Sequence, residues 1–183
     1  MKDFQKELGN ELLESVSRSF FLSLRFLPEK MREATSLGYL LARLSDTIAD
    51  TEALPEMERL GVLSEIGQAI QGGGGFPDFS SLSLGSGLTD GENILLQKSG
   101  QCLEWLNCQK DDFAKPIRIV MGSIIRGQSN DLRRFSSNNL EFLQSDESLI
   151  SIFMTLPVLW ESFGLRLGLF HMVINFQFKI MRR

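Results

Sequence analysis

A long stretch of helical periodicity between residues 29 and 51 limits most strongly what this chain can fold into. Apolar residues recur there every three or four positions, at Met31, Ala34, Leu37, Leu40, Leu41, Leu44 and Ile48. That spacing predicts a long helix with a buried face. The same stretch holds Arg43, Asp46 and Asp50, and an unpaired carboxylate is expensive to bury. The aspartates must therefore face solvent, a cation or a cavity.

The remaining apolar residues follow the same helical period. They predict helices over residues 4–16, 53–70, 91–108 and 115–134, the last starting at Pro116. Residues 71–93 are rich in Gly and Ser and predict a loop. Asp111 and Asp112 are expected in a solvated turn between two helices. The sequence shows no alternating strand pattern of useful length and no internal repeat. We therefore predict an all-α protein whose length suits one domain.

Composition argues against several functional classes. The formal net charge of −4 argues against a nucleic-acid partner held by a broad basic surface. Cys102 and Cys108 fit neither a disulfide framework nor a zinc motif, and we expect reduced thiols on different helix faces. The one histidine, His171, leaves no Ser-His-Asp or Cys-His arrangement unless that residue serves. An N-terminus without an apolar signal region predicts a cytoplasmic protein. Any chemistry is expected to depend on carboxylates, a bound metal or positioned cations.

Arg43, Asp46 and Asp50 share one face of the predicted helix, because residues three and four apart lie above one another. Glu52 follows close by. Two carboxylates one turn apart suit a hard cation such as Mg2+, especially when a phosphate supplies further oxygens. On spacing alone, a solvated helix face with an Arg–Asp pair is the better interpretation.

Five segments occur in an order that is more specific than any one of them. They are SRSF at residues 17–20, Leu-Pro at 27–28, YLLARLSDTIAD at 39–50, WL at 105–106 and IIRGQSNDLRRF at 124–135. Together they resemble the squalene/phytoene synthase family, the head-to-head prenyltransferases. The resemblance implies an all-α, isoprenoid-synthase-type helical bundle. It also implies Mg2+-dependent condensation of two prenyl diphosphates, farnesyl or geranylgeranyl, to a squalene- or phytoene-type product.

The resemblance assigns roles to the residues at matching positions. Asp46 and Asp50 stand where the family's carboxylates hold Mg2+ ions that bridge to the diphosphate. Arg43 stands where an arginine contacts the diphosphate. These three are the implied catalytic residues, with Mg2+ as the implied cofactor.

Other matching positions are implied to lie around the same substrate. Ser17, Arg18 and Ser19 match a segment that lines the diphosphate region. Asp131 falls in a helix beside the pocket, where the resemblance gives it no defined role. NADPH is implied as a further cofactor if the product is squalene.

The C-terminal part departs from the family pattern. Residues 148–183 hold four basic residues against Glu161 alone and contain no aspartate, where the family has a second aspartate-rich motif. Dropping two bases from a back-translation of PVLWESFGL (157–165) reads Cys-Phe-Val-Gly-Glu-Phe-Trp-Thr, which resembles a Val-Gly segment of the family. We therefore expect residues 1–147 to be the N-terminal part of the family domain. Residues 148–183 are expected to be out of frame, which leaves the bundle incomplete and its catalysis impaired.

Three alternatives stay open from the sequence. The tail is alternatively a genuine apolar C-terminal helix, although Glu161 and Arg166 interrupt any clean membrane-spanning run. The protein is alternatively a non-catalytic helical protein, associated with a membrane surface through that tail. The third alternative is a one-substrate terpene cyclase of the same fold. The sequence assigns neither substrate chain length nor oligomeric state.

Overall fold

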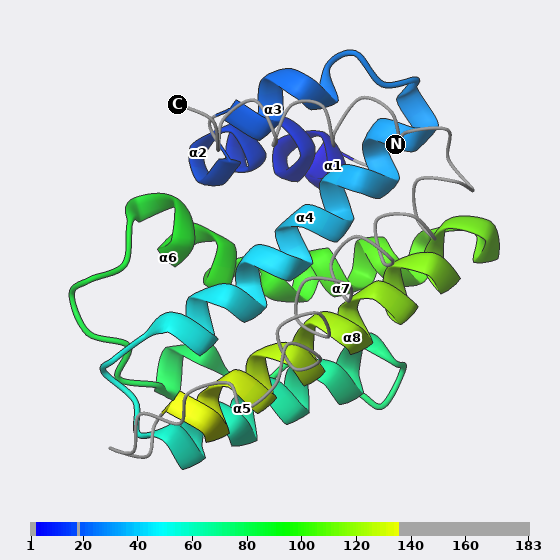
Figure 1. Cartoon of the computed structure of the whole chain (residues 1–183). Coiled ribbons are helices and arrows are strands. Elements are labelled where there is room, and N and C mark those ends of the chain that lie inside the picture. Colours follow the sequence, from blue (N-terminus) through cyan, green and yellow to red (C-terminus); the bar gives the residue numbers. More distant parts are fainter. Residues whose placement is uncertain (1–2, 18, 136–183) are drawn as a thin grey trace, which may run out of the picture. The chain divides into compact units, whose positions relative to one another are not determined.

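The computed structural model describes residues 3–17 and 19–135, and every regular element in these residues is helical (Figure 1). The all-α prediction is therefore confirmed. The described helices belong to one compact unit. The tail of residues 148–183, with its expected change of frame and the alternatives to it, lies outside the described residues.

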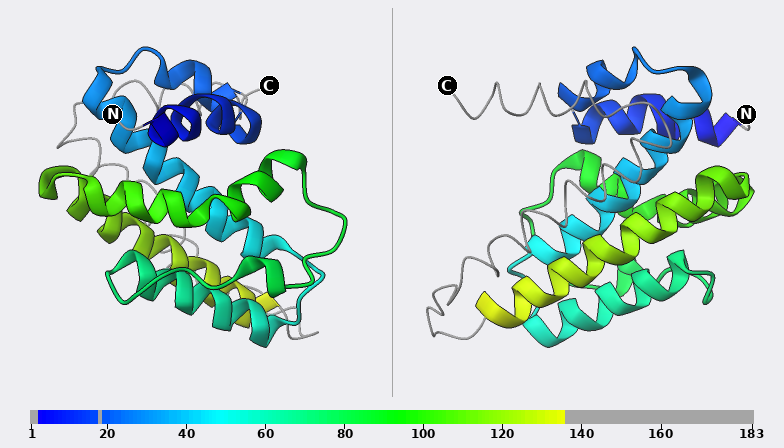
Figure 2. Two further views of the ribbon diagram at one scale, coloured as in Figure 1. Left: turned by 180° about the vertical axis from the view of Figure 1, so that it is seen from behind. Right: turned by 45° about the vertical axis from the view of Figure 1, so that its right-hand side comes forward.

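The longest predicted helix forms almost as expected, as α4 (Glu29–Asp50). Its buried face includes large apolar side chains with no exposed surface, which are Leu37, Leu40, Leu41, Leu44 and Ile48. This face packs against α5 (Glu56–Ile70) and α8 (Asp111–Phe135), two helices that lie side by side (Figure 2). At the end of α4, the Arg59 guanidinium donates a 2.8 Å hydrogen bond to the Ala49 carbonyl, which would otherwise lack a helical partner.

The N-terminal region is less regular than the apolar pattern predicts. Instead of one helix over 4–16, it forms α1 (Asp3–Glu7), the π-helical turn η1 (Leu8–Leu12) and α2 (Leu13–Ser17), followed by α3 (Ser19–Leu24). Gly9 lies in η1, where an added Cβ would stand 3.3 Å from the Trp105 ring. The missing side chain lets this turn approach α7 (Ser99–Cys108) closely.

The helix predicted over 91–108 is wrong as a single element. It forms α6 (Asp90–Gln97) and α7, separated at Lys98, whose side chain forms an ion pair with Glu7 of α1. Apolar periodicity runs through both helices and so gives no sign of the break. The loop predicted over 71–93 also ends too late, since α6 begins at Asp90; the connection contains the short 3₁₀ turn η2 (Phe79–Ser81).

Helix α8 begins earlier than its proline suggests. Asp111 and Asp112 form its first turn and are not in an interhelical turn, so that expectation is wrong. A 2.8 Å ion pair between Asp111 and Lys115 lies along this turn. Pro116 is tolerated inside the helix, near its start, where it removes one backbone hydrogen bond.

Two smaller expectations concern the cysteines and the membrane. Cys102 is buried and Cys108 is exposed, so they lie on different faces as expected. Burial raises the pKa of the Cys102 thiol to about 12. Within residues 3–17 and 19–135, no helix is both long enough and apolar enough to cross a membrane.

Candidate active site

Helix α4 presents the predicted aspartates in two different environments. Asp46 is half-buried and contacts α8, whereas Asp50, one turn later, is exposed. Although the two aspartates lie on one side of α4, their surroundings therefore differ: Asp46 faces α8 and Asp50 faces solvent.

Asp46 is held by a side chain from α8. The Gln128 amide Nε2 donates a 2.5 Å hydrogen bond to Asp46 Oδ1 and lies 3.2 Å from the Ser45 hydroxyl. Burial raises the pKa of Asp46, the Gln128 hydrogen bond opposes that rise, the Asp50 charge adds to it and the Arg43 charge opposes it. The net result is a carboxylate that lacks full solvation, which favours a nearby cation.

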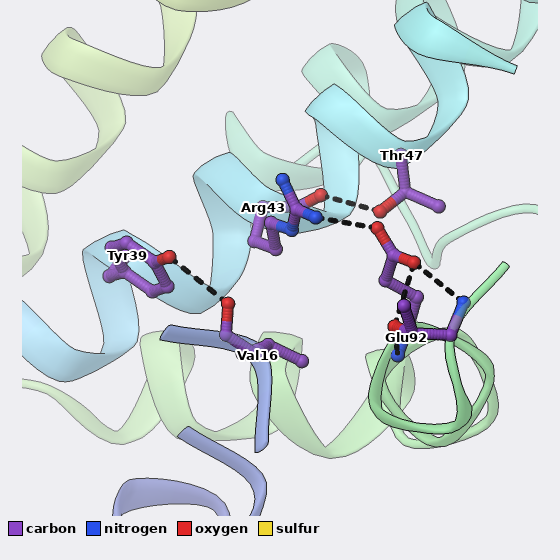
Figure 3. A network of polar contacts seen from close by, with 6 residues as sticks. Val16, Tyr39, Arg43, Thr47 and Glu92 are labelled. Atoms are coloured by element: carbon purple, nitrogen blue, oxygen red, sulfur yellow. Dashed lines mark hydrogen bonds and ion pairs between the residues drawn. The ribbon is translucent and has the colours of Figure 1, made fainter. Parts of the chain in front are cut away.

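Arg43 forms its ion pair with Glu92 of α6, and not with either aspartate of its own helix. Arg43 Nη2 lies 2.7 Å from Glu92 Oε1, and Figure 3 shows the two side chains pointing toward each other. The solvated Arg–Asp pair, which spacing alone favours, is therefore wrong.

Glu92 also caps the helix on which it lies. Its Oε2 accepts hydrogen bonds from the backbone N–H and the hydroxyl of Thr89, both at 2.8 Å, and Thr89 Oγ1 accepts the Glu92 N–H at 3.3 Å. This is a complete capping box. Burial favours a higher pKa for Glu92, but the hydrogen bonds from Thr89 and the Arg43 guanidinium outweigh burial and lower the pKa.

A cleft of about 410 Å³ lies beside this pair. Its lining comes from α4 and the residues after it, from Glu92 and from the loop before α6: Arg43, Thr47, Asp50, Thr51, Glu52, Ala53, Leu84–Leu88 and Glu92. Asp46 is not among the lining residues, since it faces Gln128. The lining thus contains the Arg43 guanidinium and the carboxylates of Asp50, Glu52 and Glu92. The Asp46 carboxylate lies one helical turn before Asp50.

The N-terminal site residues are partly described. Ser17 is buried, and its hydroxyl donates a 2.5 Å hydrogen bond to the Leu13 carbonyl within α2. Arg18 and the Ser19 side chain lie outside the described residues. The Tyr39 hydroxyl donates a 3.2 Å bond to the Val16 carbonyl, which ties the end of α2 to α4 one turn before Arg43 (Figure 3).

Three further residues of this region, Thr89, Glu92 and Gln128, were not predicted from the sequence. Thr89 and Glu92 have the spacing of a capping box before an apolar run, which indicates the start of a helix. Both residues were instead predicted to lie in the loop over 71–93. Gln128 has no such local signal, because its partner lies 82 residues earlier in the chain. Asp131 follows Gln128 by three residues and therefore shares its side of α8.

Comparisons with known proteins define first a fold and then a family. The solved structure of TcSQS in complex with the ligand E5700 matches 90% of this chain with a TM-score of 0.65 and 19% sequence identity. This match supports the isoprenoid-synthase-type all-α fold expected above. The squalene/phytoene synthase family model matches residues 13–142, and the chain belongs to that family.

The matches to one curated relative and to the solved structure also show what share of each relative's length is covered. Lycopaoctaene synthase from Botryococcus braunii is 35% identical over 63 residues, which are 34% of this chain and 14% of that enzyme. The match to TcSQS covers 46% of the TcSQS chain. This chain therefore spans less than half the length of these relatives.

Proposed function

We propose that this chain binds a prenyl diphosphate through Mg2+ held by Asp46 and Asp50, in the head-to-head condensation typical of its family. The observation that carries the proposal is the desolvated Asp46 carboxylate, one turn from the exposed Asp50 and beside Arg43. A partly buried carboxylate without an ion-pair partner of its own is costly, and a bound cation offsets that cost. Farnesyl or geranylgeranyl diphosphate is the proposed substrate class.

The residues present suit Mg2+. Within the part of the chain that the structure describes, no group of three or more His, Cys, Asp or Glu side chains is placed to hold a metal. Mg2+ typically binds through one or two carboxylates and completes its octahedral shell with water and substrate phosphate oxygens. Two aspartates that require a diphosphate to complete the shell therefore fit this ion. When bound, Mg2+ would stabilise the negative charge of the leaving diphosphate.

The protein side chains contribute charge and position. Gln128 holds Asp46 Oδ1, which leaves the second oxygen of that carboxylate available to a cation. Arg43 places a guanidinium at the cleft, where it is able to donate to phosphate oxygens. Ser17, Arg18 and Ser19 belong to this proposal through the family resemblance, and NADPH belongs to it if the product is squalene.

The 183-residue polypeptide is proposed to bind substrate but to turn it over poorly. Its sequence has no aspartate after Asp146. It therefore lacks the second aspartate-rich motif that the family resemblance leads one to expect.

Binding of inorganic pyrophosphate, measured by calorimetry with Mg2+ and again with EDTA, tests the proposal. Binding should require Mg2+, and Asp46→Ala should weaken it at least about tenfold, or about 1.4 kcal/mol. Asp112→Ala removes an equally charged but exposed side chain on α8 and should have no effect. Farnesyl diphosphate should bind likewise without measurable diphosphate release.

Mg2+-independent binding, or full binding by Asp46→Ala, would favour a non-catalytic helical protein. Rapid diphosphate release by the 183-residue chain would contradict the proposed impairment.

A further inference from the structure

Glu92 divides its carboxylate between two tasks. One oxygen accepts both hydrogen bonds of the α6 cap from Thr89, and the other pairs with Arg43. The Glu92 side chain is only 11% exposed, whereas that of Arg43 is 35% exposed. The carboxylate is therefore the fixed member of the pair, and the guanidinium is the member that solvent or a ligand reaches.

The start of α6, which carries Glu92, is itself tightly placed. A Cβ added at Gly91 would stand 2.8 Å from the Ser15 hydroxyl and 3.0 Å from a Val16 methyl, so α6 and α2 approach closely where residue 91 has no side chain. The Tyr39 hydroxyl joins the same Val16 to α4. These contacts connect α2, α4 and α6 around the Arg43–Glu92 pair.

The pair leaves most of the guanidinium unused. Arginine has five N–H donors, and Glu92 takes one of them at Nη2. A long arginine side chain otherwise loses considerable rotamer freedom when it binds a ligand. An arginine that is already held at the cleft loses less conformational entropy on binding, as in other preorganised sites.

We propose that Glu92 is a positioning residue of the diphosphate site, which holds the Arg43 guanidinium at the cleft for a phosphate oxygen. This inference rests on the proposed function, because it takes Arg43 to be a diphosphate ligand. It assigns a role in substrate binding to the start of α6, in addition to the residues of α2 and α4.

The sign of one substitution separates positioning from simple electrostatics. A carboxylate that acts only through its charge repels diphosphate, so its neutralisation would tighten binding. Glu92→Gln keeps the size of the side chain but removes the charged acceptor, and we expect it to weaken Mg2+-dependent pyrophosphate binding about tenfold. Asp90→Asn removes the same charge from the same first turn of α6, at an exposed side chain, and should leave binding unchanged or slightly tighter.

Two further variants separate positioning from helix capping. Thr89→Val removes the cap hydroxyl but keeps the Arg43–Glu92 pair, so it should lower the melting temperature without weakening pyrophosphate binding. In an Arg43→Gln background, Glu92→Gln should have no further effect, since it acts through Arg43. If Glu92→Gln fails to fold, Glu92→Asp, one methylene shorter, should weaken binding in its place.

Equal or tighter binding by folded Glu92→Gln, or by Glu92→Asp, would overturn the inference, as would a matching loss in Thr89→Val. Full binding of Mg2+-pyrophosphate by Arg43→Gln would overturn it too. The proposed function fails separately if binding does not require Mg2+ or if Asp46→Ala binds as well as the unmodified chain does. A complete lack of binding by the unmodified chain would overturn both.

Discussion

Asp46 and Asp50 share one side of α4 by their spacing, but their carboxylates differ in burial and in the residues they contact. They lie one turn apart on α4, but Asp46 meets α8 and Asp50 remains exposed. Burial raises the pKa of Asp46, and the neighbouring Asp50 charge contributes to the rise. Under the proposed function, the unfavourable charge at Asp46 lowers stability and favours a bound cation.

We predict that Asp46→Asn stabilises the metal-free protein. The amide removes the cost of an ionised, desolvated carboxylate and keeps an acceptor for Gln128. Because a raised carboxyl pKa means that ionisation costs stability at neutral pH, the melting temperature without Mg2+ should rise by about 2–4 °C. Thermal unfolding followed by circular dichroism measures this shift.

Glu65→Gln, which neutralises an exposed carboxylate in the middle of α5, serves as the control and should change little. A lower melting temperature for Asp46→Asn would show that the ionised carboxylate contributes stability through contacts other than those described here. The same variant should also lose Mg2+-dependent binding of pyrophosphate.

Helix α6 has only eight residues, but it contacts both α4 and α2 beside the candidate site. Its capping box places Glu92 against Arg43 of α4, and Gly91 allows close approach to α2. A charged pair, Arg43–Glu92, thus connects α4 and α6. The cap that begins the helix and the ion pair at the cleft share one carboxylate.

This arrangement predicts a pH dependence of stability. The pKa of Glu92 lies below its ordinary value of 4.5, so the folded protein releases this proton more readily than the unfolded chain. The contribution of Glu92 to the free energy of unfolding is therefore fully present above pH 4.5 and is lost as the pH falls through the lowered pKa.

Urea unfolding of the unmodified chain and of Glu92→Gln across this range measures the effect. The stability difference between the two should be largest near neutral pH and should shrink on acidification. A difference that grows as the pH falls would contradict the assigned direction of the pKa.

For the molecule as a whole, sequence periodicity predicted the helices better than their contacts. Residues 29–51 gave α4 nearly to the residue, because Pro28 precedes it and its apolar face is continuous. The π-helical turn and the break at Lys98 were missed, since apolar spacing continues across both.

The α4 residues of the candidate site were predictable from the sequence, but the residues of other helices that contact them were not. Arg43, Asp46 and Asp50 followed from local spacing and family resemblance. Their partners depend on which helices pack together: Gln128 lies 82 residues from Asp46, and Glu92 lies 49 residues from Arg43. A spacing argument on one helix contains no information about such distant neighbours.

The position of the metal tests the proposed site most directly. Crystals grown with pyrophosphate and Mn2+, in place of Mg2+, should show an anomalous density peak about 2.1 Å from carboxylate oxygens of Asp46 and Asp50. The pyrophosphate should then contact both this ion and Arg43. No peak at these aspartates, or a metal–pyrophosphate complex bound at another part of the chain, would contradict the proposed site.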